Sequence, residues 1–157
     1  MDEIGTQHAV ERLLVRYVAS IDENRLEDWP GFFTETCRYQ IISAENHEAK
    51  YPIGVFFANS RAMLQDRVSA LREANVYEAQ RYRHIVSPSL VTENKDGIVA
   101  TQTNYQVIRI MHDGATMLFS TGRYLDRIDL RGKEHLYQEK LVLMDSRRID
   151  TLLALPI

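Results

Sequence analysis

Apolar residues near the N-terminus recur with the spacing of a helix. They fall three or four residues apart and so share one face, whereas charged residues such as Arg12 and Arg16 fall on the other. The apolar positions are Val10, Leu13, Leu14, Tyr17, Val18 and Ile21. This pattern predicts an amphipathic helix. In the following segment, 26–33, Pro30 and Gly31 interrupt any long helix beside aromatic residues, so we predict a short helical turn packed under the first helix.

The middle of the chain mixes short segments with a second helical pattern. Residues 37–42 have strand composition, the polar stretch 43–50 is typical of a loop, and 51–57 is predicted to form another short strand. After Ser60, which can cap a helix, apolar residues return to helical spacing. These residues are Met63, Leu64, Val68 and Leu71. We therefore predict a second long helix.

The second half of the chain contains extended runs separated by turn sequences. The runs are 83–92, 98–111, 116–128 and 135–146. Asp96-Gly97, Asp113-Gly114 and Gly132 lie between them and are hairpin signals, which predicts an antiparallel meander. Most runs exceed the usual strand length of about five to six residues, so we expect a strongly bent sheet wrapped around the N-terminal helices. The expected fold is one α+β domain over residues 1–157.

Two features predict that other protein covers part of this domain. The run 98–111 is apolar on both faces, and a sheet of that kind is normally covered on both. One face holds Val99, Tyr105, Val107 and Met111, and the other holds Ile98, Ala100, Ile108 and Ile110. Six of the eight residues in 150–157 are apolar, although chain ends normally fray. We therefore expect an obligate oligomer.

Positive charge gathers where the second helix meets the sheet. The segment Arg81-Tyr82-Arg83-His84 lies there with Arg67 and Arg72. Such a group can be a solvated face, or it can be a subunit contact, because Arg and Tyr are enriched at interface hot spots. With the apolar tail, the candidate interface residues are Arg67, Arg72, Arg81, Tyr82, Arg83, His84, Leu155 and Ile157.

Composition narrows the classes of function. The chain has 19 basic and 22 acidic residues and a net charge of -3, which gives no general attraction to nucleic acid or anionic lipid. No run approaches the roughly 20 apolar residues of a membrane span, and the acidic start lacks the features of a signal peptide, so we expect a cytoplasmic protein. The single Cys37 cannot form an intrachain disulfide or supply the paired thiolates of an iron–sulfur cluster.

The histidines and carboxylates show no local metal-binding or catalytic motif. None of the five histidines has ligand spacing to another or to a carboxylate, and the common nucleotide, serine hydrolase and metalloprotease motifs are absent. A curved sheet lined by helices can still hold a pocket with an acid/base pair. Its candidate residues are Tyr17, Tyr39, His84, Tyr105 and Asp145. The simpler interpretation places Tyr17 in the core, His84 at the start of a strand and Asp145 at the end of one.

Four segments together resemble one protein family. They are WPGFFTETCRY (29–39), DRVSALRE (66–73), RYRHIV (81–86) and DTLLALPI (150–157). In this order they are similar to the small (beta) subunits of Rieske-type aromatic-ring-hydroxylating dioxygenases. Within the family, the run from Asp66 to Ile85 and the ending are most similar to members that act on terephthalate and other aromatic carboxylates.

The resemblance implies a fold, partners and a division of labour. The fold would be a cone-shaped, strongly bent antiparallel sheet with the N-terminal helices in its concave face, as in nuclear transport factor 2 and the SnoaL-like proteins. Three small subunits would join three large ones (α3β3). The large (alpha) subunit would hold the Rieske [2Fe–2S] cluster and a mononuclear Fe(II), and a reductase would deliver electrons from NADH. The resemblance implies no catalytic, cofactor-binding or metal residue in this chain.

The sequence differs from many family members in one segment, and two other functions remain as alternatives. Many members have an asparagine a few residues after the Arg-His pair, whereas this chain has Ser87-Pro88-Ser89, and the proline favours a bulge or a sheet edge. The first alternative is a freestanding, cofactor-independent isomerase or dehydratase of the same fold. The second is a ligand-binding module. The apolar tail and the two-faced strands favour the structural subunit.

Overall fold

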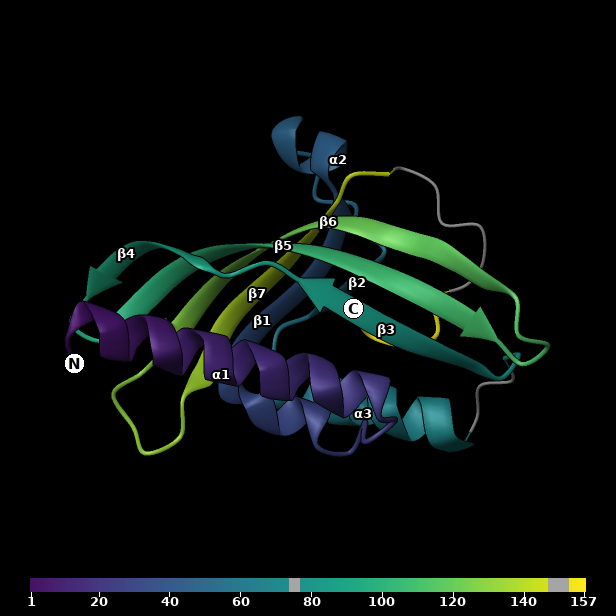
Figure 1. Ribbon diagram of the computed structural model, residues 1–157, viewed down its shortest axis with the longest axis horizontal. Coiled ribbons are helices and arrows are strands. Elements are labelled where there is room, and N and C mark those ends of the chain that lie inside the picture. Colours follow the sequence, from purple (N-terminus) through teal and green to yellow (C-terminus); the bar gives the residue numbers. More distant parts are fainter. Residues whose placement is uncertain (74–76, 147–152) are drawn as a thin grey trace.

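A computed structural model describes residues 1–73, 77–146 and 153–157. One curved sheet carries two helices on its concave side and a small helix on its convex side (Figure 1). The helices are α1 (Glu3–Asp22), α2 (Ala44–Glu48) and α3 (Arg61–Glu73), with a short 3-10 turn at Trp29–Phe32. The strands are β1 (Phe33–Ser43), β2 (Phe56–Ala58), β3 (Gln80–Val86), β4 (Leu90–Lys95), β5 (Ile98–Met111), β6 (Thr116–Asp129) and β7 (Leu136–Met144).

Helix α1 confirms the N-terminal prediction. Asp2 caps it by accepting a hydrogen bond of 2.8 Å from the Gly5 amide. All six apolar positions of the predicted face are buried, because this face packs against the concave side of the sheet. The 3-10 turn that follows lies against the helix, where Phe32 meets Tyr17 edge to face at 6.1 Å between ring centroids.

Helix α3 confirms the second helical pattern except at one position. Ser60 Oγ accepts a hydrogen bond of 3.3 Å from the Met63 amide, as expected for a cap. Leu64, Val68 and Leu71 are buried. Met63 was assigned to the same face but is exposed, because it lies at the edge of the apolar stripe in the first turn.

The strongly bent sheet is antiparallel, as predicted, except for one parallel pair of strands, so it is mixed. Its strand order is β2-β1-β7-β6-β5-β3, and β4 also pairs with β5. The hairpins β4-β5 and β5-β6 and the pair β6-β7 are antiparallel, as predicted. Strand β1, however, runs parallel to β7. Parallel pairing needs a long connection, and every other strand and α3 lie between these two in the chain.

Local predictions in the middle of the chain were partly wrong. The stretch 43–50 was predicted as a loop but contains α2, where Ser43 Oγ accepts a hydrogen bond of 3.2 Å from the Asn46 amide. Of the predicted strand 51–57, only its last two residues join β2, which pairs with β1. The run 83–92 is two strands, β3 and β4, and the break between them contains Pro88 at the edge of the sheet, as its missing amide hydrogen predicted.

Glycine and bulges bend the long strands. A β-carbon on Gly122 of β6 would overlap the main-chain oxygen of Leu143 on β7, so the two strands approach closely there. The registers of β5-β6 and β6-β7 each shift once along their length. Bulges of this kind increase twist, which lets strands of 14 residues curve around the helices.

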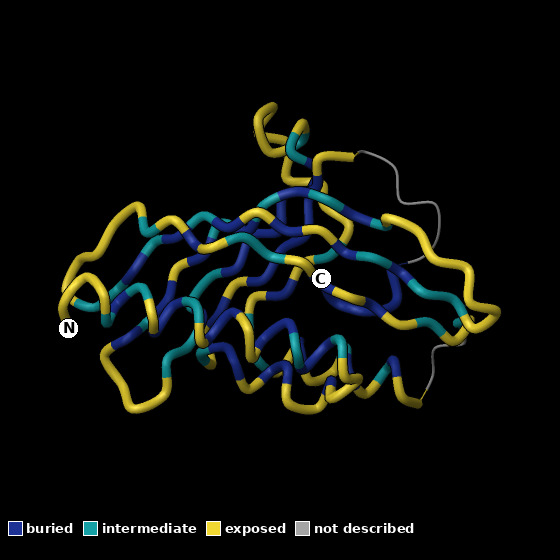
Figure 2. The backbone as a smooth tube through the Cα atoms, viewed as in Figure 1, coloured by how far each residue is buried: buried dark blue, intermediate teal, exposed yellow. Residues whose placement is uncertain are grey.

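The core lies between the concave face and the helices (Figure 2). On β5, Val99, Tyr105 and Val107 face this core, whereas the apolar residues of the opposite face are half-buried. A second, smaller buried cluster lies on the convex face at Ile42, Leu141 and Leu143, beside α2. The two-faced apolar pattern is therefore partly accounted for within the chain.

The apolar tail is buried inside the chain itself. Residues 153–157 enter the concave side, with Leu155 at 5% and Ile157 at 0% exposure. Residues 150–152 of the predicted tail lie outside the described residues. The prediction that an exposed apolar tail requires a partner is therefore wrong for residues 153–157, because the interior of the chain itself covers them.

Candidate functional site

The cone interior contains a buried charge pair enclosed by tyrosines. Lys140 on β7 lies opposite Asp126 on β6, and its Nζ is 2.9 Å from Oδ2 and 3.1 Å from Oδ1. The Lys140 side chain is 0% exposed. Its Nζ lies 3.9 Å from the ring centroid of Tyr124, 4.4 Å from Tyr137 and 4.6 Å from Tyr17. The ammonium group therefore has one carboxylate and three aromatic faces around it.

Burial dominates the electrostatics of this pair. It raises the pKa of Asp126 and lowers the pKa of Lys140, while the attraction between the two groups opposes both shifts. The pair was not predicted from the sequence, because Gln138 is an extra residue in β7 that reverses which side chains face inward. The only signal in the sequence for this pair was that Asp126 and Lys140 lie within runs of mostly apolar strand residues.

Of the five candidate pocket residues, the three tyrosines and His84 are buried, and Asp145 is exposed. The hydroxyls of Tyr17 and Tyr39 both donate to the main-chain oxygen of Ile157, at 2.8 and 2.9 Å. The Tyr105 hydroxyl shares a hydrogen bond of 3.0 Å with Ser120. Burial raises the pKa of each of these tyrosines above its ordinary value. Each is therefore a neutral phenol engaged with the protein, which suits packing better than proton transfer.

Asp145 and His84 do not join these tyrosines in one acid/base site. Asp145 follows β7 and is exposed. His84 on β3 is bound to Asp22 at the end of α1, with 2.9 Å from its amide to Oδ2 and 2.6 Å between Nδ1 and Oδ1. The His84 side chain is 0% exposed, and its Nε2 has no hydrogen-bond partner among the described residues. The contact joins the helix end to the edge strand.

The eight candidate interface residues separate into surface and interior groups. Arg81 and Arg83 point outward from β3, whereas Tyr82 and His84 alternate inward and are buried. Arg72 is exposed and pairs with Glu27 at 2.7 Å. The remaining three, Arg67, Leu155 and Ile157, all contact or belong to the buried tail. A single contact surface can include only the outward-pointing residues.

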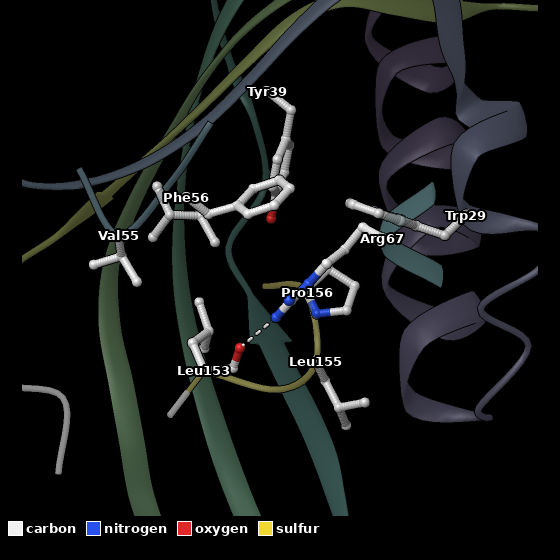
Figure 3. A pocket seen from close by; sticks show the side chains of 9 residues that line it. Trp29, Tyr39, Val55, Phe56, Arg67, Leu153, Leu155 and Pro156 are labelled. Carbon is white, nitrogen blue, oxygen red and sulfur yellow. Dashed lines mark hydrogen bonds between the residues drawn. The ribbon is translucent and has the colours of Figure 1, made fainter. Parts of the chain in front are cut away.

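Arg67 lies at an apolar cavity of about 130 Å³ at the open side of the cone (Figure 3). Strand β1, the segment before β2 and the 3-10 turn form one side, and the tail forms the other. The Arg67 Nη2 donates to the main-chain oxygens of Leu153 at 2.8 Å and Ala154 at 3.3 Å. From the sequence, Arg67 was predicted to belong to the positively charged group with Arg72 and residues 81–84, and the cavity was not predicted.

The described residues offer no metal site of the usual kind. No group of three or more His, Cys, Asp or Glu side chains in residues 1–73, 77–146 and 153–157 could hold a metal ion. Cys37 is buried, and burial raises the pKa of its thiol. In the same parts of the chain, no helix is both long and apolar enough to span a bilayer.

Comparison with known proteins gives a consistent result over most of the chain. A family model described as the ring hydroxylating beta subunit matches residues 16–151. Two beta subunits of the terminal oxygenase component of terephthalate 1,2-dioxygenase, from a Comamonas species, are each 42% identical over 142 residues, covering 90% of this chain and 92% of theirs. The anthranilate 1,2-dioxygenase small subunit of Burkholderia cepacia is 36% identical over 156 residues, covering 99% of this chain and 97% of its own.

A solved structure agrees with these sequence matches. It comes from Novosphingobium aromaticivorans and is provisionally assigned as the beta subunit of an aromatic-ring-hydroxylating dioxygenase. It is 36% identical, covers 96% of both chains and has a TM-score of 0.89. The curved sheet with helices on its concave side is therefore a shared architecture.

Proposed function

Since this chain belongs to the family of ring-hydroxylating beta subunits, we propose that it is the non-catalytic small subunit of a multicomponent Rieske dioxygenase acting on an aromatic carboxylate such as terephthalate. The family match over residues 16–151 is the observation that carries the proposal. The aromatic carboxylate is supported by the similarity to terephthalate and anthranilate dioxygenase subunits. The interior supports a structural role, because Lys140 is paired with Asp126 and the hydroxyls of Tyr17 and Tyr39 bind the tail, so these groups hold the protein together.

The side chains of this chain do not fit the iron centres of such an enzyme. A Rieske cluster needs two cysteines and two histidines, and the sequence has one cysteine. The buried His84 is engaged by Asp22. We therefore place the [2Fe–2S] cluster and the mononuclear iron in the large subunit, with NADH electrons arriving through a reductase.

The proposed role of this chain is to fix the arrangement of the large subunits in a cytoplasmic α3β3 complex. One surface suits a subunit contact. Arg81 and Arg83 on β3 lie directly opposite Ile110 and Ile108 on β5, so all four share the outward face. Ile85 and Leu118 extend this surface and are 52% and 59% exposed. We call the six residues the outer patch; arginine beside exposed aliphatic side chains is typical of interfaces.

Co-expression with a large oxygenase subunit tests the proposal. The candidate partner is a neighbouring open reading frame with the Cys-x-His and Cys-x-x-His spacing of a Rieske protein. Size-exclusion chromatography with light scattering and iron analysis should give a mixed complex that contains iron and equal numbers of both chains. The chain purified alone should contain no stoichiometric iron.

Two results would contradict the proposal. One is a chain that stays separate from every co-expressed large subunit in its genomic neighbourhood. The other is turnover of a substrate by the purified chain alone, which would favour a freestanding enzyme of the same fold.

A further inference from the structure

The cavity at Arg67 is apolar except for one charged group. Aromatic and aliphatic side chains, including Trp29, Phe56 and Leu155, form its walls, and Arg67 is the only charged residue among the described residues that line it. Its volume of about 130 Å³ is close to that of an engineered apolar cavity of about 150 Å³ that binds benzene. The apolar space is therefore large enough for one six-membered ring.

The guanidinium of Arg67 has no negative partner among the described residues. Its hydrogen bonds within the described residues all use Nη2 and go to the main-chain oxygens of Leu153 and Ala154. Nε and Nη1 have no acceptor within reach in residues 1–73, 77–146 and 153–157, and no carboxylate there forms an ion pair with this arginine. The guanidinium also lies over the Phe56 ring, 5.6 Å from its centroid. A half-buried cation without a counterion among the described residues favours an anion, and the unused N–H groups of Nε and Nη1 can each donate to a carboxylate oxygen.

We propose that this cavity is a binding site for a small aromatic monocarboxylate, with the ring in the apolar space and the carboxylate on Arg67. The site is separate from the proposed assembly role, because none of the outer-patch residues lines the cavity. It also differs from a catalytic centre, since the polar side chains among the described lining residues are Arg67, Tyr39, whose hydroxyl is bound to the tail, and Trp29. Such a site would let an aromatic acid stabilise the position of the tail, which forms one wall.

Trp29 makes binding directly observable. It is the only tryptophan of the chain and it lines the cavity, so its fluorescence reports on the site. The probe is benzoate, titrated into the purified full-length chain at constant ionic strength with excitation at the red edge of tryptophan absorption. Benzamide has the same ring and shape without the charge. We expect a saturable change with benzoate and affinity for benzamide that is about tenfold weaker or more, because a charged hydrogen bond is lost.

Two variants and one control locate the binding. Arg67→Met should weaken benzoate binding by about tenfold or more. Because Arg67 also holds the tail, Val55→Phe is a second variant that fills the cavity from its exposed rim and leaves the Arg67 hydrogen bonds in place. It should also abolish saturable binding. Arg72→Met, on the same helix but paired with Glu27 away from the cavity, should bind benzoate as the unaltered chain does.

The proposal is overturned by any of three results on chains whose circular dichroism and melting show a folded protein. The first is no saturable response to benzoate in the unaltered chain. The second is equal affinity for benzamide and benzoate. The third is unchanged benzoate affinity in Val55→Phe, which would place the binding elsewhere. None of these results depends on whether a large subunit is bound.

Discussion

At the scale of single residues, the buried pair of Lys140 and Asp126 makes each group depend on the other. Neither charge has water as an alternative partner, because the two side chains are 0% and 2% exposed. Removing one partner of such a pair leaves an uncompensated buried charge, whereas replacing both by apolar groups is often nearly neutral. The pair is therefore a weak source of net stability but a strict constraint on substitution.

Lys140→Met tests this constraint. We expect the free energy of unfolding, measured by urea titration, to fall by about 3 to 5 kcal/mol, because Asp126 then lies buried without its cation. The double variant Asp126→Leu/Lys140→Met should recover more than half of the loss. A double variant as unstable as the single one would mean that the lysine acts mainly through its packing against the tyrosine rings.

A surface carboxylate gives a pH prediction with a definite sign. Hydrogen bonds from Arg131 lower the pKa of Asp129 from 3.8 to about 2. A lowered folded-state pKa stabilises the protein above the unfolded value of 3.8, and this contribution is lost as the pH falls through about 2. In Arg131→Gln, the pKa of the Asp129 carboxyl, measured by NMR titration, should return toward 3.8. The control Arg25→Gln should leave this pKa unchanged. An unchanged midpoint in Arg131→Gln would show that the arginine is not the cause.

At the scale of elements, the sequence was most informative where one face of an element is buried. Helices α1 and α3 were predicted from their apolar stripes, and β5 has the predicted bounds of 98–111 because glycine turns flank it. Helix α2 was missed because it has only five residues, none of them buried. The parallel pairing of β1 with β7 was missed because it depends on contacts between distant segments, which no local pattern records.

The inward-facing residues of the site were harder to predict for a related reason. Alternation along a strand assigns side chains to faces only while the register is unbroken, and Gln138 breaks it in β7. Tyr17 was correctly placed in the core as part of the helical stripe. Lys140 could not be placed, because its face depends on a bulge that no turn residue marks.

Gly122 supplies a prediction at the same scale. Gly122→Ala should lower the free energy of unfolding by at least about 2 kcal/mol, because the added methyl group would overlap the Leu143 main-chain oxygen and force β6 away from β7. Gly31→Ala is the matched control, since a β-carbon there meets nothing within 4 Å. Equal melting temperatures for the two variants would show that β6 and β7 can separate at little cost.

At the scale of the whole molecule, assembly with the large subunit should be most sensitive to substitutions in the outer patch. The double variant Arg83→Glu/Ile85→Asp changes two outward side chains of β3 and no buried one. We expect it to fold normally. Co-elution with the large subunit should require a protein concentration that is higher by about tenfold or more, because hot-spot residues are reversed in charge or made polar. Val15→Asp, an exposed apolar position on α1, is the control. Equal loss of co-elution in the control would mean that the outer patch is not the specific contact.

The buried tail also sets the order in which the molecule can form. The hydrogen bonds from Tyr17 and Tyr39 to Ile157 join positions 140 and 118 residues apart. Contacts of such separation slow folding, because a long loop must close before they contribute. During synthesis, α1 and the first strand emerge long before the tail does. The nascent chain therefore completes the core around Tyr17 and Tyr39 only after residues 153–157 have left the ribosome, and until then these two hydroxyls lack the Ile157 acceptor.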